Sequence, residues 1–208
     1  MDLDAALIDE LRRVHLVHTV ILYGSRARGD ATPDSDIDVA GFAEVAETTR
    51  DARLWNGMFL DGFVYPTAQL DSTDVDMLKL LGGRVLLDER GLARPTLERL
   101  AALERQGPPP LREDDAQMRR VWARKMQARI RRDDIEARYR YHWLLFQLLE
   151  DYFALRGAWY RGPKVALAGL QRDEPAAFAA FERALAPGAG LDALDALVDL
   201  TTQQLNDP

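Results

Sequence analysis

The sequence predicts an α+β protein in which a small mixed-sheet domain is followed by an all-α helical bundle. Up to residue 107, strand-like and helix-like apolar segments alternate, as they do in domains that combine a sheet with helices. From residue 111 onward, Arg, Leu, Ala and aromatic residues dominate. Between the two halves lies Gly107-Pro108-Pro109-Pro110, where prolines without N–H donors stop both helices and strands. We therefore expect two domains, over residues 1–107 and 111–208.

The elements of the first domain follow from the spacing of its apolar residues. Four of them recur at helical intervals and predict a helix at the start of the chain: Leu3, Leu7, Leu11 and Val14. Aromatic and β-branched runs bounded by turn residues predict four strands, over His18–Tyr23, Asp36–Phe42, Met58–Tyr65 and Arg84–Leu87. We expect helices between and after these strands, near residues 45–55, 72–81 and 93–105.

The second half has the signals of about four helices joined by short connections, which make a bundle. One set of large apolar residues falls at helical spacing and predicts a core stripe: Trp143, Phe146, Leu149 and Phe153. Gly157 suits a helix C-cap. Pro163 and Pro175 are placed as first-turn prolines, and the loop 187–190 separates the last two helices.

Composition restricts the location and the partners. The 208 residues include 47% hydrophobic and 29% charged residues and no cysteine, which is typical of a soluble globular protein and excludes thiolate sites. No apolar run approaches the roughly 18 residues of a membrane span, and the acidic N-terminus is unlike a secretory signal. We expect a cytoplasmic protein without membrane contact.

Charge is distributed unevenly along the chain. The net charge of −7 argues against a stable nucleic-acid complex, because affinity for polyanions depends on Lys and Arg at phosphates. Residues 119–140 hold nine Lys or Arg against three acidic residues, so this segment is +6 and the remainder is −13. The segment is either a solvated helix face or a basic wall for an anionic ligand.

Residues 22–39, LYGSRARGDATPDSDIDV, carry the chemistry. Asp36 and Asp38 flank Ile37 on an apolar segment, and alternate strand positions share a face, about 7 Å apart along the chain. Two like charges on one buried face repel each other unless a cation bridges them. Magnesium prefers oxygen ligands and is usually held by one or two carboxylates together with substrate phosphates. The pattern indicates nucleotidyl transfer; the alternative is a pair of exposed aspartates on an edge strand.

The glycine turn before the aspartates suits a phosphate. Gly24 permits a tight bend and close approach of the backbone to an anion, and Ser25 can donate its hydroxyl to a phosphate oxygen. Of the two arginines on this turn, Arg26 and Arg28, one is expected to pair with a phosphate while the other is solvated. We take Arg28 as the nucleotide-binding residue.

This stretch resembles the DNA polymerase β nucleotidyltransferase superfamily. The signature of that superfamily is a hydrophobic residue and Gly-Ser, about ten residues, and then acidic–hydrophobic–acidic. Here the signature is Tyr23-Gly24-Ser25, residues 26–35, and Asp36-Ile37-Asp38. The form is most similar to the small bacterial branch of minimal and antibiotic nucleotidyltransferases. Members of that branch often carry a C-terminal helical bundle, with which residues 113–208 are compatible.

The superfamily places a third carboxylate on a neighbouring strand, and Asp61 is our candidate. It is the only acidic residue inside the apolar run MFLDGFVY, where an unpaired buried charge would be costly. The alternative is that Asp61-Gly62 forms a hairpin turn. Four further aspartates are weaker candidates because they lie among turn or helix signals: Asp71, Asp74, Asp76 and Asp88.

The resemblance implies a reaction and its participants. Asp36 and Asp38 would hold a nucleotide-bound Mg²⁺, and with Asp61 a second ion that activates an acceptor hydroxyl, so two ions are expected. A nucleoside monophosphate, with AMP from ATP expected, moves to the acceptor and pyrophosphate leaves. Candidates from the helical half are Lys164 for the triphosphate and Glu136 or Glu150 as the general base. A homodimer is possible.

The acceptor remains open at this point. We expect the hydroxyl of a small molecule such as an aminoglycoside-like antibiotic, because an acidic surface suits a polycation. The alternatives are a protein side chain (AMPylation) or an RNA 3′ end, as in toxin–antitoxin components. A binding protein with an inactive nucleotide pocket is a third alternative, which the filled acidic positions disfavour.

Overall fold

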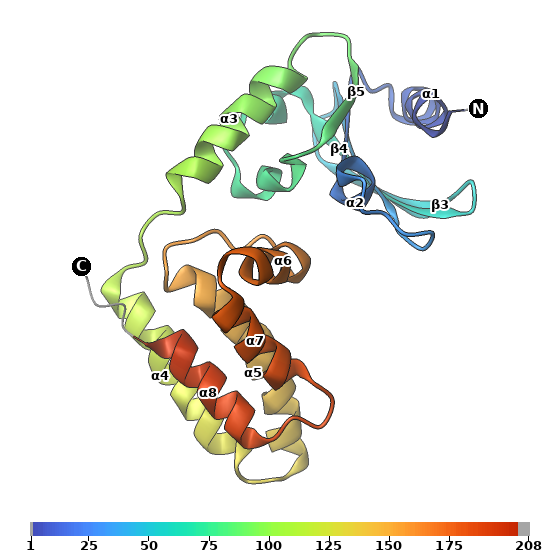
Figure 1. The fold of residues 1–208 in the computed structure, drawn as a ribbon. Helices are drawn as coiled ribbons and strands as arrows, with labels where there is room; N and C mark the ends of the chain where they lie inside the picture. The colour runs from blue at the N-terminus through green and yellow to red at the C-terminus, as the bar shows by residue number, and fades with distance from the viewer. Residues whose placement is uncertain (1, 204–208) are drawn as a thin grey trace. The chain divides into compact units, whose positions relative to one another are not determined.

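The structure is a computed structural model that describes residues 2–203 (Figure 1). The chain divides into two compact units, Met1–Gln106 and Gly107–Pro208, and each is described by itself. No helix in the described residues is long and apolar enough to span a membrane.

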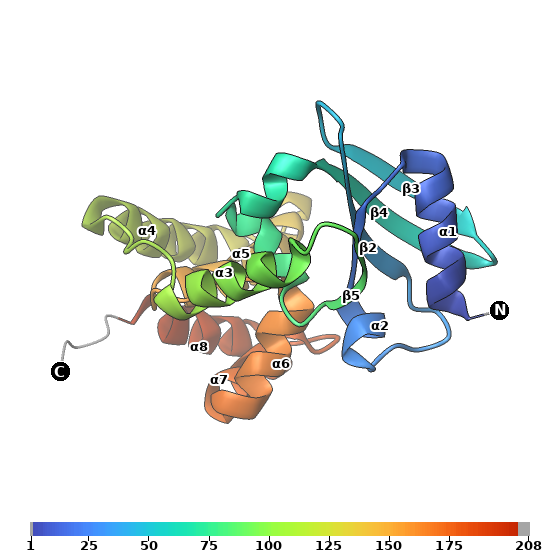
Figure 2. The ribbon, with the colours of Figure 1, turned by 90° about the horizontal axis from the view of Figure 1, so that it is seen from above.

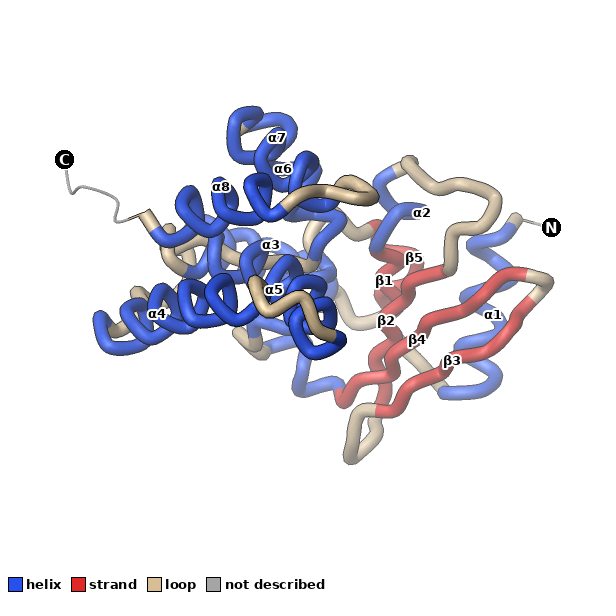
Figure 3. The backbone as a smooth tube through the Cα atoms, turned by 90° about the horizontal axis from the view of Figure 1, so that it is seen from below, coloured by secondary structure: helices blue, strands red, loops and turns tan. Residues whose placement is uncertain are grey.

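The first unit is a five-stranded mixed sheet with helices. In chain order its elements are α1 (Leu3–His15), β1 (Thr19–Tyr23), α2 (Gly24–Arg28), β2 (Ile37–Ala43), β3 (Thr49–Trp55), β4 (Met58–Pro66), the 3₁₀ helices η1 (Thr67–Asp71) and η2 (Val75–Leu80), β5 (Arg84–Asp88) and α3 (Ala93–Gln106). The strand order is β3-β4-β2-β1-β5. Figure 3 shows the strands side by side in this order, and among the strands of residues 2–203 the β2–β4 pair alone is parallel. The α+β prediction with a mixed sheet is confirmed.

The two faces of the sheet are covered differently. Leu7 and Leu11 of α1 are almost fully buried, and they pack with every second residue of the strands on one face, including Leu22, Val39 and Leu60. Trp55, at the end of β3, joins this core. The 3₁₀ helices and α3 lie on the opposite side of the sheet from α1 (Figure 2). The alternating residues that point away from α1 therefore face η1, η2 and α3.

One helix prediction in this unit was wrong, and a second corresponds to a 3₁₀ helix. Residues 45–55 contain β3 instead of a helix, and β3 forms a hairpin with β4 around Asn56-Gly57, both of which have positive φ angles (49° and 78°). Asn-Gly is the strongest short hairpin signal, and it overrides the weak helical pattern before it. The stretch near 72–81 contains the 3₁₀ helix η2 and not an α-helix.

The second unit consists, in its described part, of five helices, one more than the approximate prediction. They are α4 (Glu113–Ile130), α5 (Ile135–Ala154), α6 (Pro163–Asp173), α7 (Pro175–Leu185) and α8 (Leu191–Thr202). Pro163 and Pro175 stand in the first turns of α6 and α7 as predicted, and the loop 187–190 joins α7 to α8. Gly157 follows α5 in the left-handed conformation (φ 63°), and the N–H of Ala158 donates to the Phe153 carbonyl, so the predicted glycine cap of this helix is confirmed.

The predicted core stripe of α5 was wrong in part. Leu149 is buried, but Trp143 and Phe146 are 45% and 71% exposed. The buried face of α5 is offset by one position and is formed by Leu144, Leu145, Leu148, Leu149 and Tyr152. These residues pack against α7 and α8, where Phe181 and Leu197 are fully buried.

One ion pair inside the helical unit is a test of its stability. Asp151 is 1% exposed and accepts hydrogen bonds from the Arg119 guanidinium and from Gln147 Nε2, the latter at 3.0 Å. We expect Asp151→Ala to lower the free energy of unfolding by about 3 kcal/mol, because it leaves the Arg119 charge without its buried partner. Asp199→Ala is the matched control. Asp199 pairs with Arg124, which lies on α4 as Arg119 does, but the Asp199 side chain is largely exposed. That change should cost less than about 1 kcal/mol. Equal losses in chemical denaturation would contradict this account.

Candidate active site

The strand register brings two of the predicted carboxylates together. Asp38 of β2 lies opposite Tyr23 of β1 on one side and opposite Asp61 of β4 on the other. Because β2 and β4 are parallel and in register at this point, Asp38 and Asp61 project from the same face of the sheet. Asp61 lies within β4, and the hairpin turn is Asn56-Gly57, so the alternative turn role for Asp61 does not apply.

Gly24 lies directly against the Asp38 carboxylate. Its φ is +70°, and a Cβ atom built on it would lie 1.9 Å from Asp38 Oδ2. A side chain at residue 24 is therefore excluded by the backbone conformation and by contact with the carboxylate. Ser25, the next residue, is 5% exposed and is the second residue of the short helix α2. The glycine turn and the acidic strand thus form one compact feature.

Asp36 precedes β2 directly, and its backbone is fixed by Arg26. The Arg26 guanidinium donates to the carbonyl oxygens of Asp36 (2.9 Å) and Ser35 (2.6 Å). Arg26 therefore positions the aspartate loop, a role that the sequence did not reveal. Arg28 pairs with Asp30 at 3.4 Å and keeps a partly exposed side chain. Of the two arginines on the turn, Arg28 is the one whose guanidinium is not occupied by the loop backbone.

The negative charges of the three carboxylates affect the pKa of one residue, Tyr23. Burial raises the pKa of Tyr23 strongly, and the negative charges of Asp38, Asp61 and Asp36 raise it further. The three carboxylates thus all act electrostatically on the Tyr23 hydroxyl. A site with this concentration of negative charge attracts a cation.

The donor set suits magnesium in its chemistry. All three candidate side chains offer carboxylate oxygens, which a hard cation prefers. Within residues 2–203, however, no three His, Cys, Asp or Glu side chains are gathered closely enough to form a ready-made metal site. Asp61 already has a cationic partner, since its Oδ1 accepts a hydrogen bond from Arg50 Nε at 3.0 Å. That hydrogen bond raises the pKa of Arg50.

One family model of known proteins covers the stretch that contains the candidate site. Residues 5–78 match the family model described as "Nucleotidyltransferase domain", and this range contains the glycine turn and all three carboxylates. Residues 5–78 are a nucleotidyltransferase domain. The match agrees with the resemblance to the polymerase β superfamily, and the chemistry of the enzyme is nucleotidyl transfer.

Among solved structures, the chain is similar to a nucleotidyltransferase-like protein from Exiguobacterium sibiricum. The two share 14% sequence identity with a TM-score of 0.45, over 95% of this chain and 71% of that chain. No curated protein matches the chain.

One charged residue that was not predicted from the sequence, Lys79, lies on the face of the sheet that carries Asp38 and Asp61, which is called the active face below. Lys79 of η2 places its ammonium 3.9 Å from the ring centroid of Phe63, 5.5 Å from that of Tyr65 and 5.6 Å from that of Tyr23. Burial lowers the pKa of Lys79, whereas the charges of Asp76, Asp61 and Asp38 oppose that shift. A signal was present, because Lys79 is a single charge inside the apolar run MLKLL.

The remaining predicted residues belong to the helical unit. Lys164 is the second residue of α6, next to Pro163. Glu136 is paired with Arg140 one turn further along α5, and Glu150 lies 3.5 Å from Arg119. Their roles toward the nucleotide and the acceptor stay predictions.

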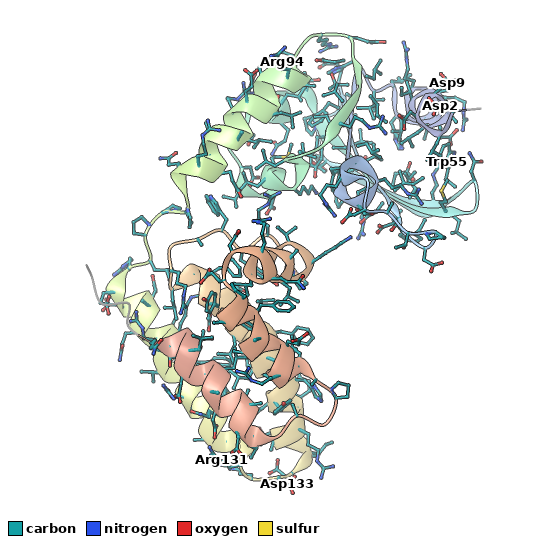
Figure 4. The ribbon with its side chains drawn as sticks, viewed as in Figure 1. Asp2, Asp9, Trp55, Arg94, Arg131 and Asp133 are labelled. Atoms are coloured by element: carbon teal, nitrogen blue, oxygen red, sulfur yellow. The ribbon has the colours of Figure 1, made fainter. Side chains whose placement is uncertain are left out.

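A cavity of about 700 Å³ opens in the helical unit. Its walls are α5, the end of α4 and the α7–α8 loop, with Tyr141, Leu145 and Phe146 among the lining residues. Arg131 and Arg138 add positive charge, and Asp133 adds negative charge. Figure 4 shows Arg131 and Asp133 at the connection between α4 and α5. The volume lies in the range of small-molecule sites.

Proposed function

We propose that the protein is a Mg²⁺-dependent nucleotidyltransferase that moves a nucleoside monophosphate, AMP from ATP, to a hydroxyl group of a small molecule and releases pyrophosphate. The observation that carries the proposal is the parallel register of Asp38 with Asp61 beside the Gly24 turn. It supplies carboxylates on two neighbouring strands and a close backbone approach for a phosphate at one place.

Different residues are proposed to bind the nucleotide and to activate the acceptor. Asp36 and Asp38 would hold the ion that accompanies the triphosphate, and Asp61 would complete a second site on the acceptor side. Bound magnesium neutralises phosphate charge and lowers the pKa of the acceptor hydroxyl. Gly24 allows the triphosphate to approach the backbone, and the Ser25 hydroxyl donates to one of its oxygens. Arg28 and Lys164 are proposed to contribute positive charge.

In the proposed reaction, the acceptor oxygen forms a bond to the α-phosphorus while the bond from this phosphorus to the β-phosphate oxygen breaks. The acceptor proton passes to a carboxylate, for which Glu136 and Glu150 are the candidates. Pyrophosphate leaves with the bonding electron pair. Positioning of the two reactants is the main contribution of the protein.

One observation supports a small polycationic acceptor: the chain outside residues 119–140 carries −13. The negative charge favours a polycationic acceptor such as an aminoglycoside-like sugar. The arginines that line the cavity of the helical unit oppose a polycation there, so the proposal does not assign the acceptor to that cavity. A homodimer and a cytoplasmic location remain predictions from the sequence.

An acceptor-labelling assay tests the proposal. The protein is incubated with Mg²⁺ and each of four labelled nucleoside triphosphates, in the presence of aminoglycosides, tRNA or a bacterial lysate. We expect label on a small molecule and release of pyrophosphate. Label on protein or on an RNA 3′ end would replace the small-molecule acceptor by one of the alternatives. No label on any acceptor, together with no triphosphate binding in calorimetry, would refute the enzymatic proposal.

A further inference from the structure

We propose that Lys79 and Arg50, which flank the ring of Phe63 on the active face, bind the phosphates that leave as pyrophosphate. The inference rests on the proposed function and names residues of the first unit that hold the leaving group. Neither residue belongs to the glycine turn or to the aspartate motif. Arg50 lies on β3 and Lys79 on η2, and these two elements come together on this face only when the sheet is folded.

Strand register places both cations with the carboxylates. Arg50 of β3 lies opposite Phe63 of β4, two positions after Asp61 on the same strand, so Arg50, Phe63 and Asp61 share one face. The Arg50 guanidinium carbon is 5.5 Å from the Phe63 centroid, and the Lys79 ammonium is 3.9 Å from it. Both cationic side chains therefore lie within cation–π distance of the Phe63 ring, at the edge of the acidic cluster.

Lys79 is held in position before any ligand arrives. Its ammonium lies within cation–π distance of three rings, those of Tyr23, Phe63 and Tyr65. A lysine that is already ordered loses little side-chain freedom when it binds a phosphate. Aromatic rings also leave its N–H donors available in a way that a direct carboxylate pair does not.

Arg50, unlike Lys79, is hydrogen-bonded to a carboxylate in the nucleotide-free protein. Its Nε atom donates to Asp61 Oδ1 at 3.0 Å, and its side chain is 58% exposed. A cation that takes over Asp61 would compete with Arg50 for the same oxygen. The released guanidinium would lie next to a newly neutralised carboxylate and would match a phosphate with its paired donors. In the nucleotide-free protein, Arg50 thus pairs with Asp61. When the nucleotide and its cation are bound, Arg50 pairs with a phosphate instead.

Magnesium pyrophosphate is the probe, because it requires no knowledge of the nucleobase. We expect Lys79→Met and Arg50→Gln each to weaken its binding about tenfold to a hundredfold in calorimetry, as loss of a charge-assisted contact implies. Lys79→Arg should recover part of the affinity. A melting curve of each variant establishes that it is folded. If Lys79→Met does not fold, Lys79→Gln replaces it in the binding measurement.

The chain provides matched controls for both residues. Arg53 lies on the same strand as Arg50 but on the opposite face, where it pairs with Asp51 and Glu10, so Arg53→Gln should leave pyrophosphate affinity unchanged. The chain has three lysines, and Lys125→Met is the control for Lys79. If Lys79→Met and Arg50→Gln bind pyrophosphate as their controls do, this inference is wrong while the proposed function stands. A wild-type protein that neither binds pyrophosphate nor transfers a nucleotide would instead refute the proposed function.

Discussion

Replacement of Asp38 by asparagine should lower the rate of nucleotidyl transfer by about 10²–10³-fold or more while the fold stays intact. Asp38 is the central carboxylate of the site, between Tyr23 and Asp61 in the sheet and against Gly24. Asparagine keeps the shape of the side chain and removes the negative charge that a cation needs. The measurement is the rate of pyrophosphate release under saturating nucleotide, with a melting curve for each variant.

The control for this change is Asp34→Asn, which makes the same chemical replacement on an exposed loop of the same motif. It should retain nearly full activity. Asp61→Asn should behave differently from Asp38→Asn, because it should keep nucleotide binding and lose transfer. If activity survives in Asp38→Asn, the metal site has been assigned to the wrong residue. If Asp61→Asn loses binding and transfer together, its role is not confined to the acceptor side.

A Gly24→Ala change should abolish transfer and also destabilise the first unit. The left-handed backbone alone costs an alanine about 1–2 kcal/mol. The new methyl group would also need the space of Asp38 Oδ2, 1.9 Å from the ideal Cβ position, so the carboxylate must move. The measurements are the transfer rate and the free energy of unfolding.

Gly29→Ala separates these two effects. Gly29 also has a positive φ, +82°, at the other end of α2, but no atom lies within 4 Å of its ideal Cβ. It should show the backbone cost of about 1 kcal/mol and keep its activity. Equal activities in the two alanine variants would mean that contact between Gly24 and Asp38 does not matter for the reaction.

The parts of the candidate site that lie close together along the chain could be proposed from the sequence. Gly24, Asp36 and Asp38 are recognisable from spacing alone, since a turn and the following strand are local features. Asp61 was found by a physical argument, because a single carboxylate in an apolar strand needs a partner. Its pairing with Arg50 was not foreseen, because Arg50 lies on a strand that had been predicted as a helix.

Arg50 and Lys79 could not be placed from the sequence because their position depends on strand order. The neighbour of β4 is known only once β3 is recognised and the sheet is assembled as β3-β4-β2-β1-β5. The exposed aromatics of α5 have a similar explanation. Apolar residues occupy two adjacent rows of this helix, and periodicity alone does not tell which row packs against α7 and α8.

The parallel register of β2 and β4 also determines when the site can form during folding. β3 and β4 pair through a tight local turn, whereas β2 must join β4 across the intervening hairpin, and such non-local pairing is intrinsically slow. Asp38 and Asp61 become neighbours only when that step is complete. The proposed affinity for a divalent cation would therefore be acquired late in assembly, because a chain that has formed only the β3–β4 hairpin does not yet hold Asp38 beside Asp61.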